Sequence, residues 1–158
     1  NADGTGVQRL LTSGGIDTEA SFTPDGKALL FSSDRGGTPQ IYRLSIATGA
    51  VERMTFEGSH NVSPRATPDG KGFVFVRREG GRFMVAIQDY ATRQVQMLTP
   101  GPLDESPSVA PNSKLVIYAA QQGSRGILAG VSSDGRLKQR LVSPAADVRE
   151  PAWGPLPR

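Results

Sequence analysis

The sequence predicts an all-β fold built from short antiparallel strands that recur along the chain. Turn-forming residues are frequent, with 19 glycines and 12 prolines among 158 residues. Between the turns, apolar and polar residues alternate with a period of two, which is typical of half-buried strands. The same pattern returns about every 44 residues, and self-similarity at a fixed period indicates a repeat architecture.

Two independent anchors define the repeat. The first is a turn of the Pro-Asp-Gly type, in which Pro presets φ and Gly accepts a positive φ. Its prolines are spaced by 44, 43 and 44 residues and are Pro24, Pro68, Pro111 and Pro155. The second anchor is a hydroxyl residue that directly follows an apolar residue. These hydroxyl residues are spaced by 43, 44 and 44 residues and are Thr12, Thr55, Thr99 and Ser143.

Each repeat divides into four strands, which in the first full repeat are expected at 20–23, 28–32, 40–45 and 51–55. Four short antiparallel strands per 40–50 residues describe one blade of a β-propeller. We therefore expect a single partial propeller domain over 1–158, a partial ring of about three and a half blades. The expected blades are 19–56, 63–100 and 106–143, with a strand of a preceding blade at 7–12 and a closing inner strand at 150–155.

Composition excludes several classes of function. The chain has no cysteine, which removes disulfides and thiolate metal sites. Its longest continuous apolar stretch, 115–120, is far shorter than the ~20 residues of a membrane-spanning helix, so no membrane insertion is expected. The net charge of +3 is small and its basic residues are dispersed, so nucleic acid is not expected as a partner.

Several segments resemble the WD-like repeats of the TolB family, the periplasmic propellers of the Tol-Pal system. The segments that carry the resemblance are DTEASFTPDGK (17–27), SDRGGTPQIY (33–42), MTFEGS (54–59), DESPSVAPN (104–112) and REPAWGP (149–155). They follow the order of that family's C-terminal half and cover nearly the whole chain. Family propellers have six blades, so the resemblance implies that upstream blades and a separate N-terminal domain are absent here.

The resemblance implies a non-enzymatic protein-binding scaffold located in the periplasm. Its expected partner is the peptidoglycan-associated lipoprotein Pal, bound at the mouth of the propeller channel in support of outer-membrane integrity and cell division. Some colicins are further expected partners, and contact with TolA is ascribed to the N-terminal domain that is absent.

Propeller geometry directs attention to the loop before each innermost strand and to the hairpin between the second and third strands. Both fall on one face, around the channel mouth, and loops on such scaffolds carry function. The candidate partner-binding residues are the polar and charged residues of these loops. They are Asp17, Thr18, Glu19, Asp34, Arg35, His60, Asn61, Ser63, Arg77, Asp104, Glu105, Arg149 and Glu150.

Structural roles compete with binding at some of these positions. Asp17 and Asp104 have side chains that can instead bond nearby backbone amides. Glu19 and Glu105 are stronger candidates, because a carboxylate at the start of an inner strand is costly unless it is paired, hydrated or bound to a cation. No cofactor is expected, although family propellers can hold calcium in the channel. Trp153 occupies the repeat position of Phe22 and is expected to pack between blades.

An enzyme is the main alternative class, because similar repeats form the propeller lids of prolyl-oligopeptidase-like serine peptidases. His60 is the only histidine and no Gly-x-Ser-x-Gly elbow occurs, so a catalytic triad is not expected. A generic peptide-binding propeller is the other alternative, and it would use the same face.

Overall fold

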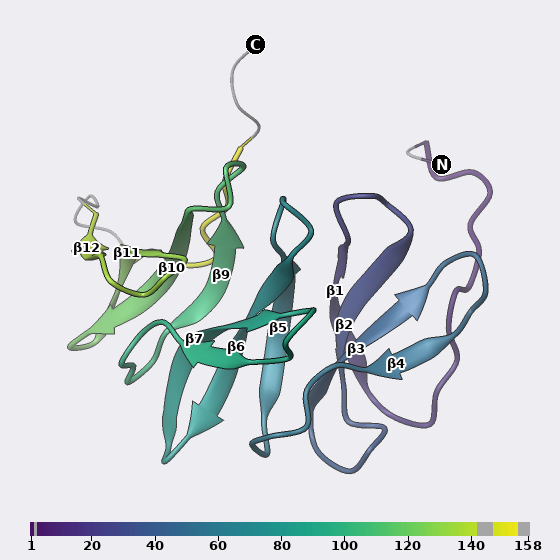
Figure 1. The fold of residues 1–158 in the computed structure, drawn as a ribbon, viewed down its shortest axis with the longest axis horizontal. Helices are drawn as coiled ribbons and strands as arrows, with labels where there is room; N and C mark the ends of the chain where they lie inside the picture. Colours follow the sequence, from purple (N-terminus) through teal and green to yellow (C-terminus); the bar gives the residue numbers. More distant parts are fainter. Residues whose placement is uncertain (2, 142–146, 155–158) are drawn as a thin grey trace.

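The protein consists of β-strands connected by turns and loops (Figure 1). The structure is a computed structural model that describes residues 1, 3–141 and 147–154. The strands within these residues form three four-stranded antiparallel sheets, which lie side by side in chain order. The predicted all-β propeller fold of four-stranded blades is therefore confirmed. No helix in the described part of the chain is long and apolar enough to cross a membrane.

Each sheet has its four strands in sequence order across its width. The first sheet contains β1 (Asp17–Phe22), β2 (Ala28–Ser33), β3 (Gln40–Ser45) and β4 (Val51–Arg53). The second contains β5 (Asn61–Ala66), β6 (Gly72–Glu79), β7 (Arg82–Asp89) and β8 (Val95–Met97). The third contains β9 (Glu105–Val109), β10 (Leu115–Gln122), β11 (Arg125–Ser132) and β12 (Lys138–Arg140).

The Pro-Asp-Gly turns join the first and second strands of a sheet through bonds that are entirely local. In the first sheet, the Thr23 hydroxyl accepts a hydrogen bond from the Ala28 backbone N–H at 3.1 Å. The Asp25 carboxylate accepts one from the Lys27 N–H at 3.1 Å. Gly26 lies at φ 66°, in the left-handed region that glycine enters without steric cost. The second sheet repeats both bonds at Thr67 and Asp69.

The repeated hydroxyl residue completes the pairing of the third strand. Thr55 Oγ1 accepts the Ile41 N–H at 2.9 Å, and Thr99 Oγ1 accepts the Val85 N–H at 2.9 Å. Both threonines are buried, and each follows a fourth strand of only three residues. The hydroxyl thus satisfies a backbone donor that would otherwise be buried without a partner. Ser143 lies outside the described residues.

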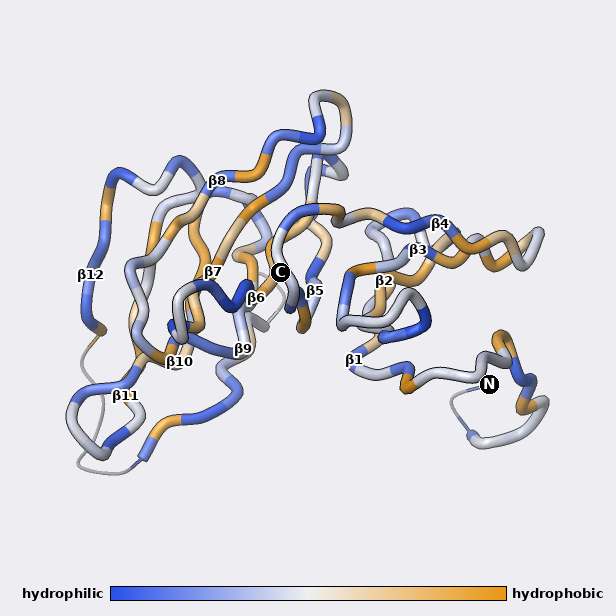
Figure 2. The backbone as a smooth tube through the Cα atoms, turned by 90° about the horizontal axis from the view of Figure 1, so that it is seen from below, coloured by the Kyte–Doolittle hydropathy of each residue, from blue (hydrophilic) through white to orange (hydrophobic). Residues whose placement is uncertain are grey.

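Two of the three hydrophobic clusters formed by the described residues lie between consecutive sheets, and the third lies on the outer face of the first sheet. One cluster joins the first two sheets and includes Leu30, Ile41 and Phe75. A second cluster joins the second and third sheets and includes Val85 and Val116. The hydrophobic stretches accordingly follow the middle strands, whereas the outer strand β12 is hydrophilic (Figure 2).

The two ends of the chain differ from the expectation of strands at 7–12 and 150–155. Neither 7–12 nor 150–154 contains a strand, and residue 155 lies outside the described residues. Leu11 packs on the outer face of the first sheet, and the Trp153 N–H donates to Ser108 Oγ at 3.1 Å. The physical reason is that a strand needs a neighbour to complete its ladder, and no other described segment pairs with either end along its length.

We predict that Thr55→Val destabilises the fold by about 1–3 kcal/mol, because it leaves the buried Ile41 N–H unpartnered. The measurement is the free energy of unfolding from urea denaturation. Thr12→Val is the matched control, since Thr12 has the same repeat position but is exposed. Equal stability of Thr55→Val and the parent chain would contradict this role for the hydroxyl.

Candidate functional site

One face of the molecule contains the segments 16–19, 60–63 and 103–106, at which the three sheets begin, the equivalent segment 147–150, and the hairpins between second and third strands. We call these segments the leading loops and this surface the mouth face. The last three leading loops are each tied to the preceding sheet by a backbone bond: Asn61 N–H to Pro39 C=O at 2.9 Å, Asp104 N–H to Phe83 C=O at 3.0 Å, and Val148 N–H to Gly126 C=O at 3.1 Å. The predicted neighbourhood of leading loops and hairpins is therefore present.

Each leading loop contains a residue in the left-handed backbone region. These residues share one repeat position and are Glu19 (φ 57°), Ser63 (φ 56°), Ser106 (φ 53°) and Glu150 (φ 48°). In the three described innermost strands, the pairing register shifts at this point. Such bulges redirect side chains and are common beside functional sites. Sequence reasoning missed this feature, because Glu and Ser carry no signal for a positive φ.

Glu19 joins the first sheet to the second. Its carboxylate accepts hydrogen bonds from the Ser63 backbone N–H at 2.9 Å, from the Ser63 hydroxyl, and from the Ser32 hydroxyl at 2.8 Å. The left-handed turn at Ser63 presents its N–H toward the neighbouring sheet. A predicted binding carboxylate is thus already engaged within the protein, where it fixes the spacing of two leading loops.

Asp17 and Arg35 form an ion pair at 2.8 Å within the first sheet. The Arg35 guanidinium also lies 5.0 Å from the Phe31 ring and 5.1 Å from the Tyr42 ring, so it is stacked as well as paired. Asp34 accepts the Ile16 N–H at 2.7 Å, which fastens the first leading loop to its hairpin.

Three side chains lower the pKa of Asp17 overall. Burial desolvates the carboxylate and on its own raises its pKa, but hydrogen bonds from Ser13, Ser33 and Arg35, with the charge of Arg35, outweigh that effect. The carboxylate therefore stays ionised and paired under ordinary conditions.

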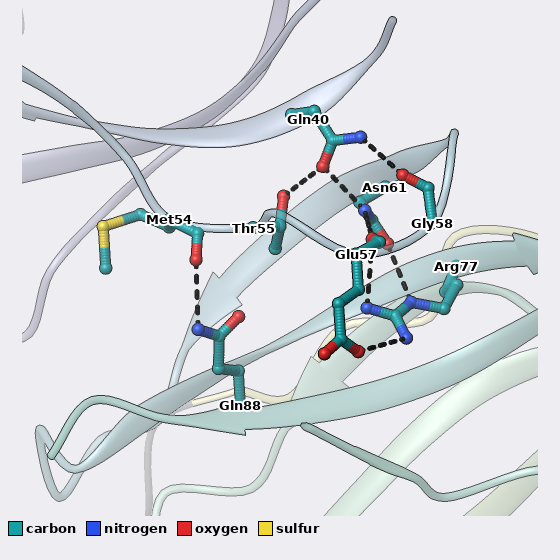
Figure 3. Close-up of polar contacts among 8 residues, drawn as sticks. All are labelled: Gln40, Met54, Thr55, Glu57, Gly58, Asn61, Arg77 and Gln88. Carbon is teal, nitrogen blue, oxygen red and sulfur yellow. Dashed lines mark hydrogen bonds and ion pairs between the residues drawn. The ribbon is translucent and has the colours of Figure 1, made fainter. Parts of the chain in front are cut away.

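A buried polar network supports the second leading loop (Figure 3). Gln40 Oε1 accepts hydrogen bonds from Thr55 Oγ1 at 2.7 Å and from Asn61 Nδ2 at 2.8 Å. Asn61 Oδ1 in turn accepts from Arg77 Nε at 3.1 Å. Arg77 further bonds the Glu57 carbonyl at 3.2 Å. Asn61 and Arg77 were predicted to bind a partner, but both are buried and support the loop instead.

Asp104 supports the third leading loop from a buried position, with 3% of its surface exposed. Its carboxylate accepts the Gly101 N–H at 3.0 Å. Burial raises the pKa of Asp104, although hydrogen bonds from Thr99 and Gly101 partly oppose that effect. The structural alternative considered for Asp104 thus matches its surroundings.

The remaining predicted residues present groups to solvent. Thr18 and Glu105 occupy the same repeat position, one residue before the left-handed residue, and both are exposed. Glu105 borders a hollow of about 150 Å³ together with Leu103 and Arg149. Arg149 pairs with Asp147 at 3.0 Å.

His60 lies edge-on to Phe83, with ring centroids 5.9 Å apart. Among the described residues, no hydroxyl or carboxylate is hydrogen-bonded to its imidazole. A second hollow of about 430 Å³ lies beside it, bordered by Glu57, Arg78 and Glu79. Charged groups of both signs are therefore available on the mouth face next to aromatic and apolar surface.

Trp153 does not pack between two sheets of the described part of the chain. Trp153 is 40% exposed and Phe22 is 66% exposed, so neither is core, because no described sheet covers that side of either residue. No three acidic or histidine side chains within the described residues come close enough together to hold a metal ion.

Known proteins resemble the chain over nearly all of its length. The family described as "TolB beta propeller domain" matches residues 1–157. "Tol-Pal system protein TolB" of Bordetella pertussis is 53% identical over 155 residues, which is 98% of this chain and 35% of that protein. The protein of the same name from Nitrosospira multiformis is 60% identical over 120 residues, or 74% of this chain and 28% of that protein. The chain thus spans about a third of the length of these curated relatives.

Solved structures show the same relationship. The crystal structure of TolB from Acinetobacter baumannii superposes with a TM-score of 0.86 at 51% identity, over 92% of this chain and 37% of that one. A prolyl endopeptidase structure superposes with a TM-score of 0.65 at 13% identity, over 84% of this chain and 22% of that one. The second likeness shows the fold alone.

We predict that Glu19→Gln lowers the free energy of unfolding by about 1 kcal/mol, because an amide cannot accept all three hydrogen bonds made by the carboxylate. Urea denaturation measures the change. Glu150→Gln is the matched control at the same left-handed repeat position, where no bond to another described residue is present. Equal effects of the two substitutions would show that Glu19 does not join the sheets.

We predict that Asp104→Asn removes a pH dependence of stability. The folded-state pKa lies above the ordinary value of 3.8, so the folded state binds the proton more tightly and the parent chain loses stability as pH rises through that window. Relative to the parent, Asp104→Asn should therefore gain stability between pH 4 and pH 7. Asp17→Asn is the opposite control, since the pKa of Asp17 is lowered. A parent-to-variant difference that is constant with pH would contradict the assignment to Asp104.

Proposed function

The chain belongs to the TolB β-propeller family, and on this premise we propose that it acts as a non-enzymatic protein-binding scaffold of the Tol-Pal system. We further propose that its partner is the lipoprotein Pal and that Pal binds to the mouth face. In this role it supports outer-membrane integrity and cell division from the periplasm. Colicins are proposed as further ligands of the same face, and TolA is proposed to contact an N-terminal domain and not these blades.

One observation carries the proposal of the mouth face: its polar residues divide into an anchored set and a free set. Asp17, Asn61 and Asp104 share one repeat position, and each is bonded within the protein. The next residue in the repeat is free to meet a partner at Thr18 and Glu105. The internal bonds therefore hold the free residues in fixed places, and such preorganisation lowers the entropic cost of binding.

Apolar side chains accompany the free polar residues. Ile16 is 69% exposed and Leu103 is 38% exposed, and they precede Asp17 and Asp104 respectively. An exposed apolar residue beside charged groups on rigid loops is typical of a protein interface, in which apolar contacts give affinity and charges give specificity. A partner segment with apolar and charged side chains would match this surface.

The relatives support a binding role over a catalytic one, because those at 53–60% identity carry the name of a Tol-Pal system protein. The alternative of a peptidase propeller rests on a shared fold at 13% identity. A generic peptide-binding propeller would use the same free residues, so the identity of the partner must be tested directly.

We predict saturable heat when the folded 158-residue chain is titrated with the soluble domain of a cognate Pal in a calorimeter. Glu105→Gln should weaken binding about tenfold while the far-UV CD spectrum stays unchanged, since an exposed charged contact is lost without a structural one. Glu52→Gln is the control, because Glu52 lies on β4, away from the mouth face. Equal affinity of Glu105→Gln and the parent would reject Glu105 as a contact, and absence of heat would reject Pal binding by these blades.

A further inference from the structure

A crevice of about 670 Å³ opens between the first and second sheets on the side opposite the mouth face. Its volume lies within the range of small-molecule and peptide side-chain sites. The Pro-Asp-Gly turns of both sheets form one wall. Its lining includes Pro24, Pro68, Met54 and Tyr90, the two arginines Arg43 and Arg93, and the three carboxylates Asp25, Asp69 and Glu52.

The repeat allows a direct comparison with the corresponding crevice between the second and third sheets. Arg43 has the repeat position of Ile87, and Tyr90 has that of Ser133. Ile87 and Ser133 both line the second crevice. The same backbone geometry therefore carries a guanidinium and a phenol in the first crevice, where the second has an alkyl chain and a small hydroxyl. The fold does not require the larger groups.

Arg93 makes a second departure from the repeat. It lies in the left-handed region at φ 59°, in the turn between β7 and β8. The equivalent position in the first sheet is Gly49 (φ 71°), where glycine adopts the same conformation without a side-chain penalty. Arg93 thus places a long side chain beside the crevice at a steric cost. It pairs with Glu52 across the gap between sheets at 3.3 Å.

Two hydrogen-bond donors in the first crevice have no partner among the described residues. The Tyr90 hydroxyl is buried, and no described residue bonds it. Arg43 is half-buried and makes no ion pair with any described residue, whereas the Asp25 and Asp69 carboxylates accept bonds within their own turns. Burial raises the pKa of Tyr90 to about 12, although the charge of Arg43 lowers it, so the phenol keeps its proton and can donate. An unpartnered phenol and a guanidinium on neighbouring sheets suit a ligand that accepts hydrogen bonds and carries negative charge.

Apolar surface lies next to these donors. Met54, Pro24 and Pro68 line the same crevice, and the Tyr90 ring packs against Phe73 with centroids 5.6 Å apart. A ligand that meets Arg43 and Tyr90 with its charged end would therefore cover the methionine and the prolines with its body. A fully polar anion would leave this apolar surface unused.

We propose that the crevice between the first and second sheets binds a carboxylate carried on a short apolar body. The carboxylate accepts hydrogen bonds from the Arg43 guanidinium and the Tyr90 hydroxyl, and the body packs on Met54 and the turn prolines. A free small acid and a peptide with an acidic residue beside an aromatic one share this chemistry. The site is independent of partner binding at the mouth face.

The test is an NMR titration of the isotope-labelled 158-residue chain with three probes. These are 3-phenylpropionate, its neutral amide 3-phenylpropionamide, and the capped peptide acetyl-Ala-Phe-Glu-Ala-amide. We expect saturable shifts at Arg43, Met54 and Tyr90 with one or both carboxylate probes, and at least about tenfold weaker binding of the amide, since a charge-assisted hydrogen bond is lost. Binding of only one carboxylate probe identifies the source of the ligand. No saturable shift with either up to about 10 mM, or equal binding of the amide, overturns the proposal.

Two substitutions in the crevice and one outside it distinguish a loss of ligand binding from a change in the fold. Arg43→Gln should weaken the bound carboxylate probe about tenfold, and Tyr90→Phe should weaken it about threefold while leaving the rest of the spectrum in place. Arg136→Gln is the control, because Arg136 is an exposed arginine in the turn between β11 and β12 and does not line this crevice. Unchanged affinity in both Arg43→Gln and Tyr90→Phe, or an equal loss in Arg136→Gln, would overturn the site.

Discussion

Every sheet in this protein depends on a neighbour to cover its faces. The second sheet shows the constraint most fully, since Phe75 and Ala86 pack toward the first sheet while Val74 and Val85 pack toward the third. A four-stranded sheet with two apolar faces is unstable alone, so stability is shared between consecutive units. Because the sheets must pack face to face, their leading loops and hairpins are brought to one end and their turns to the other. Both candidate sites follow from that packing.

One repeat position anchors the leading loop of each sheet, but through a different interaction in each case. Asp17 is held by an exposed ion pair with Arg35, Asn61 by a buried amide network, and Asp104 by the backbone N–H of Gly101. In each case the anchored side chain fixes the loop that presents the following residue. The polar side chains at these positions therefore stabilise the loops. They assist binding only by holding the following residue in place.

Turn chemistry is local, which is why the sequence predicted the sheets so well. The bonds at Thr23 and Asp25 span two to five residues, so their residue types alone identify the turn. The contact between Glu19 and Ser63 joins residues 44 positions apart and depends on a left-handed backbone that neither residue type signals. For the same reason, the burial of Asn61 and Arg77 was not predictable, because it follows from how two sheets meet.

A comparison of equivalent positions in the three sheets shows which residues the fold itself explains. Where residue type and geometry both recur, as at Thr55 and Thr99, the fold itself explains the residue. Arg93 is the opposite case, because glycine occupies the same left-handed position in the first sheet. A left-handed conformation costs a residue with a side chain about 1–2 kcal/mol. The ion pair with Glu52 is exposed on both sides, and such pairs contribute at most about 1 kcal/mol. The contacts of Arg93 within the protein therefore offset only part of its cost, and the crevice beside it supplies a reason for keeping it there.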